Sequence, residues 1–531
     1  MRLIFIPACV LLLAACARGP APDAVAPAPA PERAMGPLVA EMTLAEASAQ
    51  LAAGSLSAEA LTQAYLERIE QIDRSGPALN SVIELNPEAL ADARALDAER
   101  VAGKVRGPLH GIPVLLKDNI DAVGMANSAG SLALAGNRPP RDAFIVERLR
   151  AAGAVILGKT NLSEWANFRS TRSSSGWSSR GGQTRNAYVL DRNPCGSSAG
   201  TGTAVAASLA MIGVGTETDG SIICPSAVNG LVGLKPTVGL VSRGGIIPIS
   251  VSQDTAGPMG RSVADVAALL NVLAAVDEAD PAAAAAVGKV AADYTAGLDA
   301  DALQGKRFGI LRQAMGFNPD VDAAVERAVA SLRAGGAEVV DVEVTTWGQW
   351  RDDEFNVLLY EFKDGLNAYL AAAGGEHASL ESLIAWNAGH AADAMPHFGQ
   401  EIFEQAQAKG PLTEPAYAKA RDSARRLAGE QGLLASMDKL TLDAVIAPST
   451  SPAWPTDHVN GDHFSGAGYG IAAVAGTPSI TVPSGEVRGL PMGVVFMGRP
   501  YSEAELIGYA YAYEQATMAR KPPAFLPTLP Y

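Results

Sequence analysis

The chain has 531 residues, of which 48% are hydrophobic and 18% charged, and its formal net charge is −15 at pH 7. This balance excludes a disordered chain and favours a globular protein with a large core. The basic residues form no marked cluster, so nucleic acid is not an expected partner, and the acidity mainly favours solubility.

The first residues are typical of an export signal. Arg2 supplies a positive charge, and residues 3–15 are apolar but too short to cross a bilayer as a mature helix. The run LAAC that ends at Cys16 resembles a bacterial lipobox, in which cleavage leaves a lipid-bearing cysteine. We therefore predict a lipoprotein-type signal peptide over residues 1–16. The mature protein is then expected on the periplasmic side of the cell envelope, attached to a membrane only through Cys16. The alternative is an ordinary secretory signal with a chance cysteine.

Residues 17–42 are rich in Ala and Pro and show no apolar period, so we expect a disordered tether. The helical pattern begins at Thr43, which forms a predicted capping box with Glu46. We place a single globular domain over residues 43–531, with residues 345–440 as a mostly helical insert or lid.

Strands and helices alternate along this domain. Short apolar runs predict strands, and apolar residues at helical spacing predict helices. The predicted helices cover residues 87–101, 144–152, 203–211 and 321–334, with a last helix capped by Ser502, and the predicted strands cover residues 112–116, 154–157, 307–311, 337–344, 442–447, 479–482 and 493–496. This alternation indicates an α/β fold, with a central mixed sheet covered by helices on both faces.

Four cysteines are present, and two of them, Cys9 and Cys16, belong to the predicted signal. An oxidising compartment would allow Cys195 and Cys224 to form a bridge. The sequence does not show whether these two residues face each other, and we favour two free, buried thiols. No Cys or His spacing suggests a metal site, and no cofactor is expected.

Small residues dominate the stretch from Asn193 to Thr237. One interpretation is that glycine exposes backbone N–H groups to a developing charge, and the other is close packing of helix on strand. No phosphate-binding glycine motif is present. Residues 196–200 match the GxSxG nucleophile elbow around Ser198, and Asp443 and His458 follow downstream in the order of a triad. The elbow requires a strand directly before it, whereas the residues there are polar and include Pro194.

Three blocks of the sequence together resemble the amidase signature family. They are residues 108–119 (PLHGIPVLLKDN), residues 158–165 (GKTNLSEW) and residues 195–237. Within that family, residues 180–186 (RGGQTRN), 216–221 (TETDGS) and 238–248 (VGLVSRGGIIP) look like the bacterial peptide amidases, which remove the C-terminal amide from peptides. The resemblance covers roughly residues 43–517.

The resemblance implies a catalytic set. Ser221 matches the nucleophile, Ser197 the serine that relays the proton, and Lys117 the base. The backbone N–H groups of Thr218, Asp219, Gly220 and Ser221 match the oxyanion hole. The family also has a cis peptide bond before the middle serine, here between Gly196 and Ser197. Alignment to the family motif, and not spacing, separates Ser197 from its neighbour Ser198.

A lysine can act as this base only when it is neutral. The ordinary lysine pKa of about 10.4 leaves the amine charged at pH 7, whereas burial among apolar neighbours lowers the pKa. Each residue also has a plainer interpretation. Lys117 could form a surface ion pair with Asp118, Ser197 could cap the following helix, and Glu217 and Asp219 are expected to be structural.

The leading hypothesis is an amide hydrolase that works through an acyl-enzyme and releases ammonia from peptide C-terminal amides or similar small amides. Many family members carry Arg two residues after the nucleophile, whereas this chain has Ile223, which favours a neutral or peptide-like acyl group. The alternatives are a broad amidase for aryl or fatty amides and a non-catalytic envelope lipoprotein. The export signal argues against the cytoplasmic amidotransferase component that resembles this family.

Overall fold

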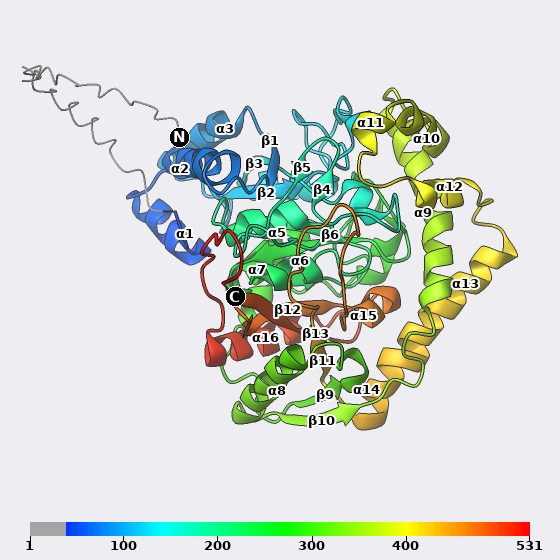
Figure 1. Cartoon of the computed structure of the whole chain (residues 1–531). Helices are drawn as coiled ribbons and strands as arrows, with labels where there is room; N and C mark the ends of the chain where they lie inside the picture. Colours follow the sequence, from blue (N-terminus) through cyan, green and yellow to red (C-terminus); the bar gives the residue numbers. More distant parts are fainter. Residues whose placement is uncertain (1–38, 531) are drawn as a thin grey trace, which may run out of the picture. The chain divides into compact units, whose positions relative to one another are not determined.

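The computed structural model describes residues 39–530, and an eleven-stranded mixed sheet runs through this part of the chain (Figure 1). The strand order is β1-β3-β2-β6-β8-β7-β12-β13-β11-β9-β10. The bounds are β1 (Val82–Leu85), β2 (Pro113–Lys117), β3 (Val155–Thr160), β6 (Ile212–Glu217), β7 (Val232–Lys235), β8 (Thr255–Gly260), β9 (Arg307–Leu311), β10 (Glu338–Val342), β11 (Ala444–Pro448), β12 (Ser479–Val487) and β13 (Leu490–Met497). A separate two-stranded sheet pairs β4 (Trp177–Ser178) with β5 (Gly182–Gln183).

The sheet is mixed because parallel pairs flank an antiparallel centre. Strand β2 runs parallel to both β3 and β6, and β9 runs parallel to β10 and β11. The pairs β6·β8, β7·β8, β7·β12, β12·β13 and β11·β13 are antiparallel, as is the edge pair β1·β3. The β2·β6 register pairs Leu116 with Val214, which brings the ends of these two strands to the same place in the sheet.

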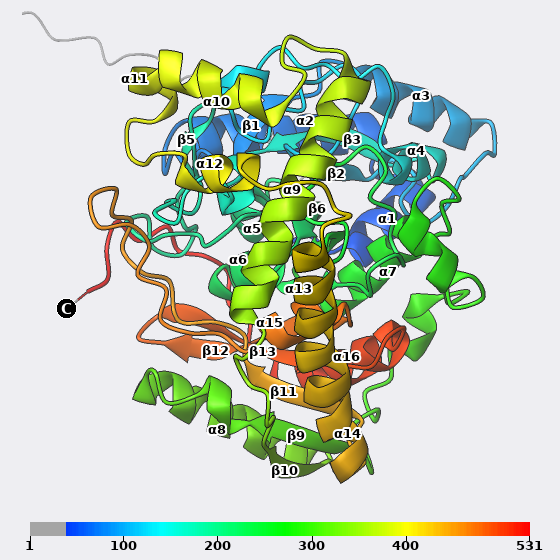
Figure 2. The same ribbon diagram turned by 90° about the vertical axis from the view of Figure 1, so that its right-hand side faces the viewer.

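Helices cover the sheet, as the views in Figures 1 and 2 show. Their bounds are α1 (Leu44–Ala53), α2 (Ala58–Arg68), α3 (Ala89–Val101), α4 (Phe144–Ala151), α5 (Ala199–Ala206), α6 (Ile223–Val228), α7 (Val263–Leu273), α8 (Pro319–Ala334), α9 (Arg351–Ala373), α10 (Leu380–Gly389), α11 (Ala391–Ala394), α12 (Glu401–Gln407), α13 (Pro415–Arg425), α14 (Leu434–Leu440), α15 (Gly470–Ala475) and α16 (Glu503–Thr517), with π-helical turns at Ile69–Arg74 and Arg426–Leu433. Strands β2, β6 and β8 are buried along their whole length, which explains their runs of apolar and small residues.

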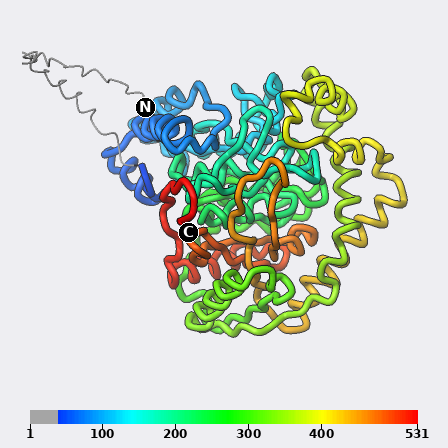
Figure 3. Tube along the Cα trace, in the orientation of Figure 1, coloured from blue at the N-terminus to red at the C-terminus, as the bar shows by residue number. Residues whose placement is uncertain are grey.

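The stretch between β10 and β11 contains α9 to α14 and no strand. Helices α9 and α13 lie side by side along one edge of this part of the molecule (Figures 2 and 3). None of the helices in the described part of the chain is long and apolar enough to cross a membrane.

The predicted α/β fold is confirmed, and most predicted strands and helices lie within a few residues of the observed ones. The capping box at Thr43 is also confirmed, because its hydroxyl accepts from the Glu46 N–H at 3.2 Å. The cap at Ser502 is wrong: its hydroxyl donates to the Arg499 carbonyl at 2.8 Å instead of capping α16.

The predicted signal peptide, the anchor at Cys16 and most of the predicted tether lie outside the described residues. Residues 39–42, at the end of that tether, are described, and the side chains of Val39 and Met42 are buried.

Candidate active site

Lys117 is the last residue of β2, and its side chain lies wholly inside the protein. The amine donates to the Ser197 hydroxyl at 2.7 Å, to the Thr216 hydroxyl at 2.8 Å and to the Thr216 carbonyl at 3.1 Å. Asn119 donates to the same Thr216 hydroxyl at 2.9 Å. The amine therefore contacts uncharged oxygens, and a surface ion pair is excluded for this residue.

The surroundings of Lys117 favour the neutral amine. Burial lowers the pKa of Lys117 to about 7, against an ordinary value of 10.5, while the carboxylates of Asp254 and Glu217 oppose the shift. Its sequence neighbour Asp118 does not supply a counter-charge, because it pairs with Lys159 at 3.2 Å and with Arg180 at 3.2 Å. Near neutral pH a large fraction of the Lys117 amine can therefore accept a proton.

Ser197 lies between Lys117 and a cavity that is lined by Ser197 and Ser221. The peptide bond between Gly196 and Ser197 is cis, as the family resemblance implies. The Ser197 carbonyl accepts from the Ser163 N–H at 3.1 Å, and a Cβ at position 196 would lie 2.1 Å from the Ser163 hydroxyl. Only glycine therefore fits before Ser197.

Ser198 has a different place in the structure. Its hydroxyl donates to the Thr216 carbonyl at 3.1 Å and accepts from the Thr216 N–H at 3.3 Å, which ties the start of α5 to β6. The residues before Ser198 form no strand. The two residues expected to complete a triad with it have other contacts: Asp443 accepts from the Arg307 N–H, and the His458 ring stacks on another histidine. The nucleophile elbow around Ser198 is therefore excluded.

Ser221 stands in the turn between β6 and α6, and its side chain is 8% exposed. Glu217 fixes this turn because its carboxylate accepts from the N–H groups of Ile222 at 2.6 Å and Ile223 at 2.9 Å, and contacts the Gly220 N–H. Gly220 has φ of +85°, a conformation that favours glycine.

Three of the four N–H groups predicted for the oxyanion hole remain available. The backbone N–H groups of Thr218, Asp219 and Ser221 donate to no acceptor within residues 39–530, whereas that of Gly220 faces Glu217. The Thr218 side chain is itself held, since its hydroxyl donates to Asp254 at 2.6 Å.

The cavity beside Ser221 has a volume of about 270 Å³. Its polar lining includes Ser197, Thr216 and Thr218 and the ion pair of Arg243 with Asp280, and much of the rest is apolar. The apolar lining residues include Ala166, Ile246, Ile247, Pro248, Ile249 and Val251. A small uncharged acyl group would fit such a lining better than an anion.

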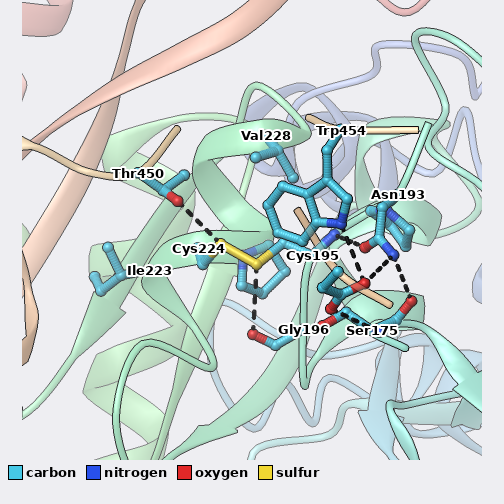
Figure 4. Close-up of a disulfide and its surroundings, with 12 residues drawn as sticks. Ser175, Asn193, Cys195, Gly196, Ile223, Cys224, Val228, Thr450 and Trp454 are labelled. Carbon is cyan, nitrogen blue, oxygen red and sulfur yellow. Dashed lines mark hydrogen bonds between the residues drawn. A yellow bond between two sulfur atoms is a disulfide. The ribbon is translucent and has the colours of Figure 1, made fainter. Parts of the chain in front are cut away.

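A disulfide joins Cys195 and Cys224, whose Cα atoms are 6.0 Å apart, so the expectation of two free thiols is wrong (Figure 4). The two residues are 29 positions apart, and only the folded chain brings α6 against the segment before Ser197. The bridge thus ties the strand-to-helix turn of Ser221 to the loop that carries Ser197.

The sequence interpretation missed three contributors. Thr216 and Asn119 bind or orient the Lys117 amine, and Asp254 holds Thr218. Thr216 and Asn119 lie inside recognised motifs, whereas Asp254 follows an unremarkable turn. Within residues 39–530 no group of three or more His, Cys, Asp or Glu side chains could hold a metal ion.

Comparison with known proteins gives consistent matches. The family model described as Amidase matches residues 60–507. The solved native peptide amidase from Stenotrophomonas maltophilia is 55% identical, covers 92% of this chain and 99% of its own, and has a TM-score of 0.88. The probable amidase At4g34880 of Arabidopsis thaliana is 39% identical over 487 residues, 89% of each chain. A glutamyl-tRNA(Gln) amidotransferase component of Symbiobacterium thermophilum is 34% identical over 484 residues, 88% of this chain and 94% of the relative.

Proposed function

Because this chain belongs to the amidase signature family and is a hydrolase of carbon–nitrogen amide bonds, we propose that it removes the C-terminal amide of peptides through Ser221, Ser197 and Lys117. The observation that carries the proposal is the 2.7 Å hydrogen bond from the buried Lys117 amine to Ser197, at the wall of the cavity that contains Ser221.

The reaction starts with neutral Lys117. Its amine accepts the proton of the Ser197 hydroxyl as Ser197 accepts the proton of Ser221, and the Ser221 oxygen forms a bond to the amide carbon. The N–H groups of Thr218 and Ser221 stabilise the negative charge on the substrate oxygen, and one such donor contributes about 3–4 kcal/mol to lowering the barrier.

The carbon–nitrogen bond then breaks, and the nitrogen takes a proton back through Ser197 and leaves as ammonia. Water adds to the resulting ester of Ser221 and gives its proton to the same relay. The C–O bond to Ser221 breaks, which releases the free acid and restores the serine. Every proton therefore passes through Ser197, which agrees with its place between the amine and the cavity.

Two features support a peptide-like, uncharged acyl group. The related structure from Stenotrophomonas maltophilia is a peptide amidase, and its match to this chain covers 99% of its own length. The cavity lining is mostly apolar.

The test is ammonia release from a panel of peptide amides, aryl amides and fatty amides, combined with labelling by a fluorophosphonate. We expect the wild type to prefer peptide amides and Ser221→Ala to lose both activity and label. Ser226→Ala, in the helix that follows Ser221 but outside the cavity, is the matched control and should keep both. A broad preference for aryl or fatty amides would refute the substrate, and an unlabelled, inactive wild type would support a non-catalytic protein.

We also propose that the protein is exported and lipid-anchored at Cys16. The support is the apolar run of residues 3–15, the lipobox-like LAAC, and the Cys195–Cys224 disulfide, a bond typical of oxidising compartments. Cys16→Ser should move the protein from the membrane fraction to the soluble fraction, whereas the control Cys9→Ser should not. Unchanged fractionation of Cys16→Ser would refute the anchor.

A further inference from the structure

A second cavity, of about 600 Å³, lies on the other side of the turn that carries Ser221. The turn contributes Thr218 and Ser221 to the first cavity and Asp219 to the second. The first turn of α9 supplies Arg351 and Glu354 to its lining, and the start of α15 supplies Gly470. The catalytic reaction described above makes no use of this cavity.

Two carboxyl groups face each other in this second cavity. Asp219 and Glu354 share a hydrogen bond. Burial raises the pKa of each carboxyl group, and a neighbouring carboxylate adds to the rise, Glu217 for Asp219 and Asp219 for Glu354. The Asp219 side chain is exposed to the cavity, whereas Glu354 is buried and accepts from the Gln253 amide at 3.1 Å. Within residues 39–530 neither carboxyl group has a cationic side chain within 4.0 Å, so their acceptor capacity is available to a ligand.

Tyr469 is a second, independent sign of a ligand. The residue is only 9% exposed and lines the cavity, yet its hydroxyl has no hydrogen-bond partner in the described chain. Its ring packs against Gly220, where an added Cβ would lie 2.2 Å from the ring. This hydroxyl keeps some access to the cavity, so a ligand bound there can form a hydrogen bond with it.

The remaining walls are largely aromatic. Trp347 and Trp350 meet edge to face at 5.5 Å between ring centroids, and Phe317 and Phe464 also line the space. Aromatic faces attract cations, most strongly in desolvated sites. Arg351 is the single cationic side chain among the lining residues of the described chain, and from beyond 4.0 Å its charge partly offsets those of the two carboxyl groups.

We propose that this second cavity binds a primary ammonium group of the substrate, supplied by a basic side chain or by a free amino terminus. Asp219 and Glu354 accept the N–H groups of the ammonium, Tyr469 supplies a further oxygen, and the indoles cover the alkyl chain. The inference rests on the proposed function, because it assigns a specificity site to the same amidase reaction. Asp219 is two residues from Ser221, so the proposed site adjoins the turn that carries the nucleophile.

The test compares three substrates of similar size: Nα-acetyl-lysinamide, Nα-acetyl-norleucinamide and norleucinamide with its free amino group. We expect kcat/KM for one of the two ammonium-bearing substrates to exceed that for the neutral one by about tenfold, as one charge-assisted hydrogen bond predicts. The favoured substrate identifies whether the side chain or the amino terminus occupies the cavity.

The variants Glu354→Gln and Asp219→Asn should bring this ratio close to one. The control Asp352→Asn removes an equal charge from the same helix turn outside the cavity, and it should keep the wild-type ratio. Equal kcat/KM values for the three substrates in the wild type, or a preference that survives both cavity variants, would overturn the inference.

A binding measurement separates this inference from the proposed function. Calorimetric titration of Ser221→Ala protein with the three amides requires no turnover. Tighter binding of an ammonium-bearing amide that is lost with Glu354→Gln supports the cavity assignment even if the wild type hydrolyses no amide. Equal binding of all three amides overturns it even if peptide amides are hydrolysed.

Discussion

Replacing Lys117 with methionine tests the central element of the site. The substitution keeps a long, unbranched chain at a fully buried position and removes the amine. Without the base, kcat/KM should fall by about 10²–10⁴-fold. In the wild type, kcat/KM should rise about tenfold per pH unit below pH 7 and level off above it, because only the neutral amine accepts the proton.

The same variant has a predicted effect on stability. The folded-state pKa of Lys117 is about 7, below the ordinary 10.5, so between these values the unfolded chain binds the extra proton. The wild type is therefore destabilised most below pH 7, by about 5 kcal/mol for a shift of roughly 3.5 pH units at about 1.4 kcal/mol each. This penalty disappears as the pH rises towards 10.5.

Urea unfolding of both proteins from pH 7 to pH 9.5 measures the difference directly. The stability of Lys117→Met relative to the wild type should decrease by about 1.4 kcal/mol per pH unit, because other titrating groups cancel in the comparison. The hydrogen bonds lost with the amine shift the stability difference by the same amount at every pH, so they do not change its slope against pH. A constant difference across this range would refute a depressed lysine pKa, and with it the neutral base.

Three further results are expected. Ser197→Ala should lower kcat/KM by about 10²-fold or more because the proton relay is lost. Ser198→Ala should mainly lower the free energy of unfolding, by about 1 kcal/mol. Equal losses of kcat/KM in the two variants would contradict the assignment of Ser197 as the relay. Replacing both Cys195 and Cys224 with alanine should lower the free energy of unfolding by about 2–4 kcal/mol in urea titrations, and unchanged stability would contradict the bridge. Gly220→Ala should abolish most amide hydrolysis, since its φ of +85° and the adjacent tyrosine ring leave no room for a Cβ, and full activity would contradict that packing.

Much of the sheet follows from local sequence. The runs before Lys117 and from Arg307 to Leu311 are short, apolar and bounded by turn residues, so they predict β2 and β9 well. Strand β8 was missed because its sequence, TAGPMG, contains Gly and Pro and one β-branched residue. Pairing on both sides by β6 and β7 sets its conformation, which is a tertiary effect.

The catalytic residues were predictable only through family resemblance. Spacing could not separate Ser197 from Ser198, because the two adjacent side chains differ only in the direction in which they point. The Ser197 hydroxyl accepts from the Lys117 amine, whereas the Ser198 hydroxyl donates to the Thr216 carbonyl. The disulfide between Cys195 and Cys224 depends on the packing of α6 against a loop that is distant in the sequence, so no local sequence pattern predicts it. The same holds for Glu354, which reaches Asp219 from a helix that begins more than a hundred residues further along the chain.

The strand-free stretch between β10 and β11 has a consequence for protein engineering. It contributes Arg351 and Glu354 to the second cavity, yet none of its residues takes part in the β2·β6 register that places Lys117 beside Thr216. Substitutions in the first turn of α9 can therefore redesign selectivity, whereas a graft of the whole helix would also exchange Gly365 and Tyr369, which line the cavity beside Ser221. A library confined to that first turn would sample new substrates without rebuilding the catalyst.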